Sequence, residues 1–335
     1  MRSKIAIAIL NWNGVHYLKK FLPTVVEHST HPDISISVID NGSTDDSVSF
    51  VKNNFQQVNL VCLDKNYGFT GGYNKGLQKI EAEYYIILNS DIEVTPNWIL
   101  PVISEFERNE KMAAAAPKLL SYSDRDTFEY AGAAGGFIDY LGYPFCRGRI
   151  ISKLEKDNGQ YDTSIPVFWA SGACMFVRAE LFHNLGGFDD NFFAHMEEID
   201  LCWRMKNAGY QVYNCHNSTV YHVGGGTLPN NSPRKIFLNY RNNLLLLYKN
   251  LKKRSLAKVL LVRFFLDLAS ASIFFIQGKF KFSLALFRAY WSFFSMRKQY
   301  KIDRTGLKTF PEIWTKSIVI NFFIFGRKKF SDYNK

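Results

Sequence analysis

Oxygen-bearing side chains follow a strongly apolar segment of the chain at Asn89-Ser90-Asp91, and Glu93 comes soon after. Residues 84–88 are apolar without interruption, which is typical of a strand buried on both faces of a parallel sheet. A carboxylate at the end of such a strand is costly to desolvate unless a cation or hydrogen bonds compensate its charge. Mg²⁺ is usually bound through one or two carboxylates together with substrate phosphates. The segment is therefore a candidate cation site, and a strand ending in a simple turn is the alternative.

A second acidic group, Glu197, Glu198 and Asp200, begins a segment whose apolar residues recur with helical period over residues 197–208. Acids in the first turn of a helix are stabilised by the helix dipole, which is the non-catalytic explanation. Three acids directly after an aromatic loop exceed what a helix terminus needs. One of them is therefore a candidate general base, with a pKa set by burial and by its neighbours.

The elements that would position these groups alternate along the first hundred residues. We expect strands at residues 5–10, 34–39, 58–63 and 84–88, and helices at 17–27 and from Asp45 or Asp46 to 54. This alternation predicts a parallel sheet with right-handed crossovers. The four strands end in polar residues, namely Asn11, Asp40, Asn66 and Asp91. Because ligands of such sheets bind outside the carboxyl ends of the strands, these residues predict a binding crevice.

Several side chains near this crevice have two interpretations. Asp40 is an acceptor for a base or a ribose hydroxyl, or only a turn acceptor. Gly68, Gly71 and Gly72 form a turn that lets backbone N–H groups approach a phosphate, although the spacing fits neither a dinucleotide fingerprint nor a P-loop. His222 precedes three glycines, residues 224–226, and is either a phosphate-side contact or an ordinary packed histidine.

The middle of the chain mixes helical, strand-like and glycine-rich segments. We expect a helix at residues 96–111, a strand-rich stretch at 167–177, a short helix at 178–185 and a strand at 211–214. Residues 128–149 are rich in glycine and aromatics and predict a long irregular loop. Arg147 and Arg149 in that loop either face phosphate or are solvated.

Charge divides the chain near Lys249. Residues 249–335 hold 19 Lys and Arg against 4 Asp and Glu, a net charge of +15 within a total of +11. We predict a domain boundary there, between one domain at residues 1–248 and an extension at 249–335. Five scattered cysteines without a C-x-x-C pair predict reduced thiols in a cytosolic protein.

The basic extension is also apolar and helical in pattern. Residues 259–276 are long enough to suggest a membrane span, but Arg263 and Asp267 interrupt them. Residues 280–294 repeat apolar side chains at helical spacing between basic ones, as in helices that lie in a membrane interface. We predict peripheral membrane binding, with a helical lid or a dimer contact as the alternative. No motif supports a nucleic-acid partner.

Five blocks in order resemble one family over residues 4–250: the inverting family 2 glycosyltransferases with the GT-A fold, including rhamnosyltransferase-like enzymes of bacterial cell-surface polysaccharides. The blocks are residues 5–13, 38–45, 66–76, 88–91 and 187–202. The resemblance implies an α/β fold with a mainly parallel sheet flanked by helices, followed by the basic, apolar helical extension. It makes residues 1–248 the catalytic domain, with a nucleotide-binding half at 1–95 and an acceptor half at 96–248.

The resemblance also implies roles for individual residues. It implies that Asp40 contacts the nucleobase and that Asp91 binds the divalent metal, Mg²⁺ or Mn²⁺. It implies that Glu198 is the general base that deprotonates the acceptor hydroxyl. It makes His222 a further metal or pyrophosphate contact. The first acid of the D-x-D metal motif is Asn89 here, and Glu197 competes with Glu198 for the role of base. The candidates for donor binding are Asn11, Asn13, Asp40, Asn66, Gly72, Asn74, Asn89, Trp169 and Asp200.

The resulting expectation is an inverting, metal-dependent transfer of a sugar from a UDP- or dTDP-linked donor to a hydroxyl of a saccharide or lipid-linked acceptor. Rhamnose from a dTDP donor is one such case. The enzyme would work in cell-surface polysaccharide synthesis, on the inner face of the plasma membrane, and a dimer is one option for its oligomeric state. The alternatives are a nucleotidyltransferase that makes sugar nucleotides, for which the expected basic Gly-rich loop after residues 5–10 is missing, and a non-catalytic saccharide-binding protein.

Overall fold

The computed structural model describes residues 3–224, 232–302, 304 and 307–333, and a mixed sheet forms the core of this part of the chain. Its strands lie in the order β11 (Ile165–Val167), β13 (Gln211–His222), β6 (Met112–Ser121), β12 (Cys174–Arg178), β4, β1, β2 and β3. A further strand, β5 (Ile92–Val94), pairs with β13. The four N-terminal strands are parallel: β1 (Ser3–Asn11), β2 (Ile34–Asp40), β3 (Asn59–Cys62) and β4 (Ala82–Asn89). Asn11 lies opposite Asp40, and Leu10 lies opposite Asn89, so the polar strand ends share one edge, as predicted.

Three helices connect these strands, and they confirm the predicted alternation: α1 (Val15–Glu27), α2 (Ser47–Asn54) and α3 (Gly68–Leu77). The sequence predicts a glycine-rich turn that enters a short helix; the helix is present as α3, but it already begins at Gly68, so Gly71 and Gly72 lie inside the helix and not in a turn. A Cβ on Gly72 would lie 2.8 Å from Leu10 Cδ1, and one on Gly76 would lie 2.4 Å from Ile39 Cδ1. These glycines therefore let α3 pack closely on β1 and β2.

The second half of the sheet continues from β4 through an antiparallel strand. Its elements are β5 (Ile92–Val94), α4 (Leu100–Arg108), β6 (Met112–Ser121), β11 (Ile165–Val167), β12 (Cys174–Arg178), α5 (Ala179–Asn184), η1 (Asp190–Phe192), α6 (Glu197–Asn207) and β13 (Gln211–His222). Strand β12 pairs antiparallel with both β4 and β6 and so joins the two halves. Two predicted bounds are wrong: α4 begins at Leu100 instead of residue 96, and β13 continues to His222 instead of ending at residue 214.

The predicted irregular loop at residues 128–149 instead builds much of a second, small sheet. The order of its strands is β10 (Lys153–Leu154), β9 (Arg149–Ile150), β8 (Pro144–Cys146), β7 (Gly136–Asp139) and β14 (Ile313–Trp314). Arg147 and Arg149 are neither phosphate-facing nor solvated, because they are only 4% and 5% exposed. Arg147 Nε donates to Ala134 O at 2.8 Å, and the Arg149 guanidinium lies over the Tyr130 ring.

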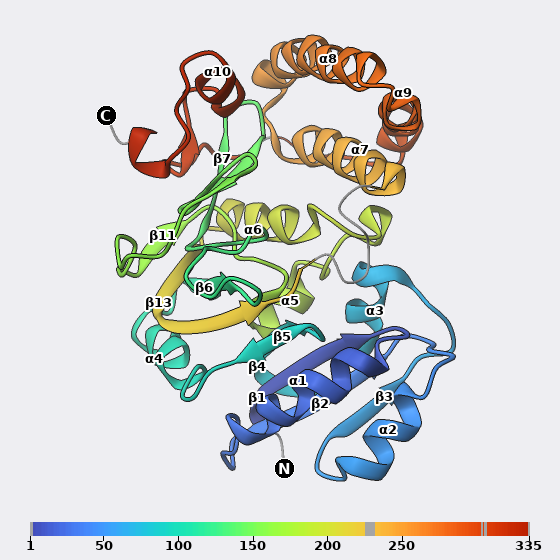
Figure 1. Cartoon of the computed structure of the whole chain (residues 1–335), viewed down its shortest axis with the longest axis vertical. Coiled ribbons are helices and arrows are strands. Elements are labelled where there is room, and N and C mark those ends of the chain that lie inside the picture. The colour runs from blue at the N-terminus through green and yellow to red at the C-terminus, as the bar shows by residue number, and fades with distance from the viewer. Residues whose placement is uncertain (1–2, 225–231, 303, 305–306, 334–335) are drawn as a thin grey trace.

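Helices of the C-terminal part gather at the end of the molecule opposite β1–β3 (Figure 1). They are α7 (Pro233–Asn250), α8 (Lys253–Ile276), α9 (Phe280–Met296), η2 (Arg297–Gln299), α10 (Ile318–Phe323) and η3 (Phe330–Tyr333). The extension is less helical than predicted, since the chain after η2 returns to the small sheet, where Trp314 and Phe330 pack on Phe145. The proposed boundary near Lys249 falls in the last turn of α7, and the division into domains stays a prediction.

Helix α8 buries its two central charges, Arg263 and Asp267, whereas many of its apolar side chains are exposed. Arg263 is 2% exposed, and its Nε lies 3.4 Å from Asp267 Oδ1. Tyr143 and Tyr290 both donate to the same carboxylate, and Arg263 Nη1 donates to Leu141 O. Within the described residues, α8 is the one helix long and apolar enough to span a membrane, judged by length and composition alone.

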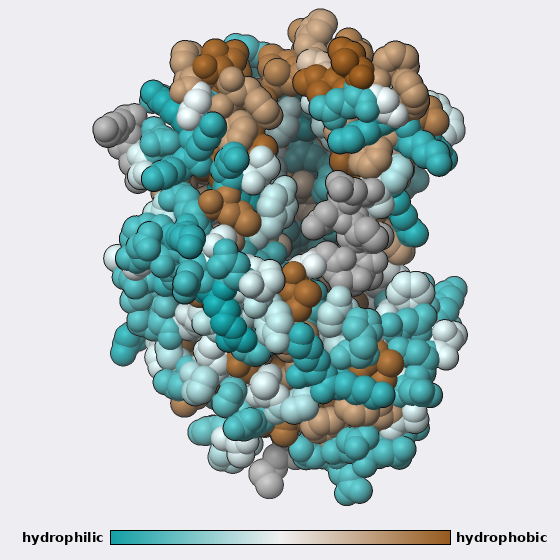
Figure 2. All heavy atoms as spheres, viewed as in Figure 1, coloured by the Kyte–Doolittle hydropathy of each residue, from teal (hydrophilic) through white to brown (hydrophobic). Residues whose placement is uncertain are grey.

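Exposed apolar side chains gather at this end, visible as brown spheres with teal ones between them at the top of Figure 2. We call this surface the apolar crest and define it by the most exposed apolar residues of α8, of α9 and of residues 323–325. Its members are Leu261, Phe265, Ile273, Phe275, Ile276, Phe280, Leu284, Phe287, Trp291, Phe294, Phe323, Ile324 and Phe325. The crest is much larger than the single apolar residues scattered over most protein surfaces.

Candidate active site

The edge where β1 and β2 end holds interlocked polar side chains. Asn11 Nδ2 donates to Asp40 Oδ1 at 3.3 Å and to Ser43 Oγ at 3.2 Å. Asp40 Oδ2 accepts from the backbone N–H of Ser43, and Asn13 Oδ1 accepts from that of Thr44. Asp40 is thus both a turn acceptor and part of the crevice edge, and the buried Oδ1 of Asn11 has no protein partner. The nucleotide contacts of Asn11, Asn13 and Asp40 stay predictions.

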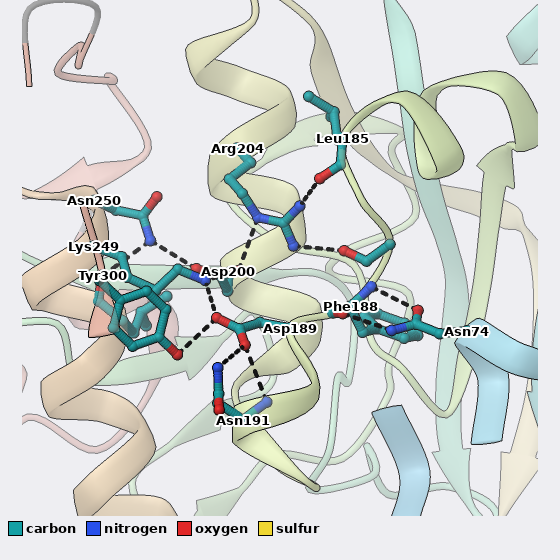
Figure 3. A network of polar contacts seen from close by, with 12 residues as sticks. Asn74, Leu185, Phe188, Asp189, Asn191, Asp200, Arg204, Lys249, Asn250 and Tyr300 are labelled. Atoms are coloured by element: carbon teal, nitrogen blue, oxygen red, sulfur yellow. Dashed lines mark hydrogen bonds and ion pairs between the residues drawn. The ribbon is translucent and has the colours of Figure 1, made fainter. Parts of the chain in front are cut away.

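Three predicted donor-binding residues lie just before α3 or inside it, namely Asn66, Gly72 and Asn74. The following contacts join them to other parts of the protein. Asn66 Oδ1 accepts from Gly68 N at 2.8 Å, and Gly72 leaves room for Leu10. Asn74 Nδ2 donates to Phe188 O at 2.7 Å, which ties α3 to the loop before α6 (Figure 3). These contacts give the three residues a positioning role, and their donor contacts stay predictions.

A histidine between two carboxylates occupies the edge where β4 and β13 end. His222 Nε2 lies 3.2 Å from Asp91 Oδ1, and His222 Nδ1 lies 3.3 Å from Glu129 Oε1. Asn89 Nδ2 is 3.5 Å from the same Nε2. Strand pairing causes this meeting, because His222 lies opposite Ile92 in the β13–β5 ladder, directly after Asp91. Two of the predicted metal-side residues, Asp91 and His222, are therefore brought together.

The charges in this cluster compensate each other. Burial alone would raise the pKa of Asp91, but the hydrogen bond and the charge of His222 outweigh burial and lower it. Burial alone would lower the pKa of His222, but contacts with Asp91 and Glu129 raise it to about 10. In the absence of a cation, the imidazolium is the positive partner of both acids.

The donor set fits a hard divalent cation. Asp91 and His222 offer a carboxylate oxygen and an imidazole nitrogen, and the Asn89 amide lies beside them, with its Nδ2 near His222 Nε2. Among the described residues, no group of three or more His, Cys, Asp or Glu is arranged to hold a metal ion. A site with few protein ligands matches the preference of Mg²⁺ for completing its shell with substrate phosphates and water.

The second acidic group lies at the start of α6, after a tightly turned loop. Phe193, His195 and Met196 have φ of 65°, 72° and 72°, in the left-handed region that costs energy for residues other than glycine. Glu197 is 5% exposed, whereas Glu198 is partly exposed. Glu198 is therefore the acid of the pair that a substrate hydroxyl can reach more easily.

The Oε2 atoms of both glutamates are buried, and neither has a hydrogen-bond partner among the residues that the structure describes. Burial raises the pKa of Glu198 to about 7. Burial and the charge of Glu198 raise the pKa of Glu197 well above its ordinary value. A carboxylate with a pKa near neutrality is suited to accept a proton at physiological pH.

A short segment before β12 connects the two acidic groups. Asn89 N donates to Ala173 O at 2.9 Å. The adjacent Gly172 has no side chain, and a Cβ placed there would lie 3.6 Å from Glu198 Cβ. The end of β4 and the start of α6 are therefore neighbours across this segment.

A polar network behind α6 fixes the helix and the loop before it (Figure 3). Asp200 is 0% exposed, and its carboxylate accepts from Arg204, Lys249 and Asn250 at 2.8, 2.8 and 2.9 Å. Lys249 Nζ also donates to Asp189 Oδ2 at 2.6 Å. Asp200 was expected to bind the donor, but its oxygens are occupied by protein donors, so the geometry corrects this expectation to a positioning role.

Trp169 is also placed away from the crevice surface. It is 3% exposed, its Nε1 donates to Phe137 O at 3.0 Å, and a Cβ on Gly136 would overlap its ring. The indole therefore joins the small sheet to the main one. Its expected contact with the donor is not supported by this packing.

Three positioning residues were not found from the sequence. Arg241 Nη2 donates to Asn191 O at 2.9 Å and to Phe192 O at 3.0 Å. Asn242 Nδ2 donates to the carbonyl oxygens of Phe192, Ala194 and His195 at 2.8 to 2.9 Å. Glu129 is the third. The sequence contains a signal for Arg241 and Asn242, because the run Arg-Asn-Asn after Tyr240 places polar residues inside an otherwise apolar helix. It contains none for Glu129.

Comparisons with known proteins agree with this geometry. Residues 6–186 match the model of glycosyl transferase family 2. An N-acetylglucosaminyl-diphospho-decaprenol L-rhamnosyltransferase of Mycobacterium tuberculosis is 24% identical, over 68% of this chain and 78% of the relative. A dTDP-rhamnosyl transferase of Shigella flexneri, RfbF, is 25% identical, over 75% and 82%.

One solved structure, GalNAc-T7 with UDP, GalNAc and Mn²⁺, has a TM-score of 0.59 at 15% identity. The match covers 75% of this chain and 49% of that chain, and it supports the fold.

The chain belongs to glycosyl transferase family 2, because the family match covers more than half of its residues. The predicted α/β fold of GT-A type and the predicted glycosyl transfer are thereby confirmed. The names of the relatives agree with the further expectation of a nucleotide-sugar enzyme of cell-surface glycan synthesis, similar to rhamnosyltransferases.

Proposed function

We propose that the chain is an inverting, metal-dependent glycosyltransferase that moves a hexosyl or deoxyhexosyl group from a UDP- or dTDP-linked donor. The acceptor is a hydroxyl of a saccharide or lipid-linked saccharide in cell-surface polysaccharide synthesis. The observation that carries this proposal is the approach of the Asp91–His222 edge to the Glu198 end of α6 across Gly172. The names of the relatives support the proposal, because one states a dTDP-rhamnosyl donor and the other a decaprenol-linked acceptor.

In this proposal each residue of the site has a distinct task. Glu198, with its pKa near 7, accepts the proton of the acceptor hydroxyl, which then attacks the anomeric carbon from the face opposite the departing nucleotide. Asp91 and His222, with Asn89, hold Mg²⁺ or Mn²⁺. The bound cation would neutralise charge on the departing diphosphate. Asn242 fixes the carbonyl groups of the loop before Glu198 and so keeps the base in place.

The metal role is tested by nucleotide release from a panel of UDP- and dTDP-sugars with Mg²⁺ or Mn²⁺. Asp91→Ala is expected to lower turnover by about 100-fold or more, because the departing charge is no longer neutralised. Glu93→Ala is the matched control, since this acid is nearby but pairs with Arg125 at 2.7 Å. Unchanged turnover in Asp91→Ala would overturn the metal role.

We further propose that the apolar crest lies on the inner face of the plasma membrane. Arg263 and Asp267 face the protein, and the crest faces outward, which is the reverse of a helix that faces water. The surrounding +15 segment would be attracted to anionic headgroups, and Trp291, 79% exposed, is an aromatic of the kind that membrane interfaces favour.

Membrane binding is tested by sedimentation with phosphatidylglycerol-containing vesicles. We expect the full chain to sediment with them, and Trp291→Ser with Phe323→Ser to bind at least tenfold more weakly, because two large apolar side chains leave the interface. Leu154→Ser, on the small sheet, changes an exposed apolar residue outside the crest and should have no effect. Equal binding by all three proteins would contradict the proposed orientation.

A further inference from the structure

A groove of about 560 Å³ lies between α7 and α9, beside the loop that enters α6. Phe193 of that loop and Pro233 line one part of it. The remaining lining residues are Arg234, Phe237, Leu238 and Arg241 of α7 and Lys281, Leu284, Ala285 and Arg288 of α9.

The two helices present the same pattern to the groove. On each, a cation is followed three and four residues later by apolar side chains and seven residues later by a second cation. This spacing places the four residues on one face of a helix. The described lining therefore contains four cations, an apolar surface between them and no carboxylate.

The four cations of the groove differ in how many contacts they already make with the protein. Arg241 donates to Asn191 O and Phe192 O, and Arg234 lies 4.9 Å over the Phe193 ring. Lys281 and Arg288 are exposed and form no ion pair with any described residue. Cations gathered without acids favour an anion with several oxygens, and guanidinium groups suit phosphate geometry.

The groove also connects two functional surfaces. Leu284 lines it and is 57% exposed as a member of the apolar crest, and Phe287 and Trp291 continue the crest along α9. At its other side, Phe193 belongs to the loop that ends at Glu198. A ligand in the groove would therefore have lipid on one side and the proposed base on the other.

We propose that this groove binds the diphosphate of a lipid-linked acceptor, with the lipid chain along the crest and the saccharide directed to Glu198. The inference rests on the proposed function, and it names the acceptor as a prenyl diphosphate saccharide. The donor diphosphate belongs at the other edge, with Asp91 and His222. The ligand chemistry is an anionic head joined to an apolar chain, which matches both the four cations and the apolar lining.

The test is binding of farnesyl diphosphate to the full chain, measured calorimetrically without any sugar nucleotide. We expect Lys281→Gln with Arg288→Gln to weaken binding at least tenfold, because two charge-assisted contacts are lost. Lys279→Gln with Lys298→Gln is the matched control, since it removes two exposed cations at the ends of the same helix outside the groove, and we expect less than a twofold change. Arg234→Gln is a third variant and should weaken binding severalfold.

Further measurements distinguish a prenyl diphosphate from a free phosphate or a lipid headgroup as the anion that binds, and test the transferase activity separately. Inorganic pyrophosphate should bind at least tenfold more weakly than farnesyl diphosphate, and phosphatidylglycerol in bicelles should not displace the latter. Equal binding of pyrophosphate, displacement by phosphatidylglycerol, or equal losses in both double variants would each overturn the proposal. Nucleotide release with a phosphate-free alkyl glycoside tests the transferase separately. Its failure alone would contradict the proposed function and leave the binding result to decide the groove.

Discussion

The two acidic clusters of the active site are buried to a similar degree but are treated in opposite ways. Asp91 is paired with His222, and the pKa of Asp91 is lowered. Glu197 and Glu198 have no cationic partner among the described residues, and the pKa of each is raised. A cationic partner therefore decides which task a buried carboxylate can perform. A paired carboxylate stays charged and can bind a metal ion beside the deprotonated imidazole of its partner, whereas an unpaired one is ready to take a proton.

The largest expected effect removes the proton acceptor. Glu198→Gln keeps the shape of the side chain and should lower kcat by about 10²- to 10⁴-fold, because the amide cannot act as a base. Glu197→Gln should have a much smaller effect, since Glu197 is the less exposed acid. Single-turnover sugar transfer measures both. A loss of rate in Glu197→Gln with full rate in Glu198→Gln would exchange the two roles.

A smaller effect is expected at the paired cluster. Glu129 lies 3.3 Å from His222 Nδ1, and a carboxylate on the second nitrogen of a ligating histidine fixes its orientation. Glu129→Gln should therefore weaken Mn²⁺ binding about 10-fold, as measured by calorimetry in the presence of UDP. Glu155→Gln, at a half-buried glutamate whose carboxylate accepts from Tyr161 and from Phe330 N, is the control for removing a hydrogen-bonded carboxylate elsewhere. Unchanged Mn²⁺ affinity in Glu129→Gln would contradict the role.

The smallest expected effect is on the free energy of unfolding. Neutralising a carboxylate should change it in opposite directions in the two clusters. The folded-state pKa of Glu198 is raised from about 4.5 to about 7, so its contribution to stability is lost as pH rises through that window. At pH 8, Glu198→Gln should raise the free energy of unfolding by about 1 to 3 kcal/mol. Asp91→Asn should lower it, because the buried His222 loses a charged partner.

Thermal unfolding of both variants at pH 8 and pH 5 measures these changes. The gain from Glu198→Gln should largely disappear at pH 5, where the wild-type carboxyl is mostly protonated in the folded state. Destabilisation by Glu198→Gln at pH 8 would mean that its buried carboxylate has a compensating partner.

Sequence patterns predicted the parallel half of the sheet and its polar edge well, because each strand end is encoded locally. The 3.6-residue period similarly located α6 and its acids. The patterns failed where contacts join distant segments. His222 meets Asp91 only because β13 runs on to pair with Ile92, the first residue of β5. Asn242 donates to carbonyl groups of a loop that lies 47 to 50 residues earlier in the chain.

Two other failures have the same cause. The small sheet could not be foreseen, since β14 pairs with β7 across most of the C-terminal half of the chain. The glycines of α3 looked like a phosphate turn, but they serve helix–sheet packing. Short-range patterns do not distinguish a glycine needed for a ligand from one needed for a neighbouring strand.

The pH dependence of kcat/KM for sugar transfer, at saturating Mn²⁺, tests most directly the claim that an unpaired glutamate is the base. In the proposed mechanism, deprotonated Glu198 is the active form, and burial raises its pKa to about 7. We therefore expect kcat/KM to fall tenfold per pH unit below about pH 7 and to be level above it. A profile that stays level down to pH 5 would contradict an unpaired, buried Glu198 acting as the base.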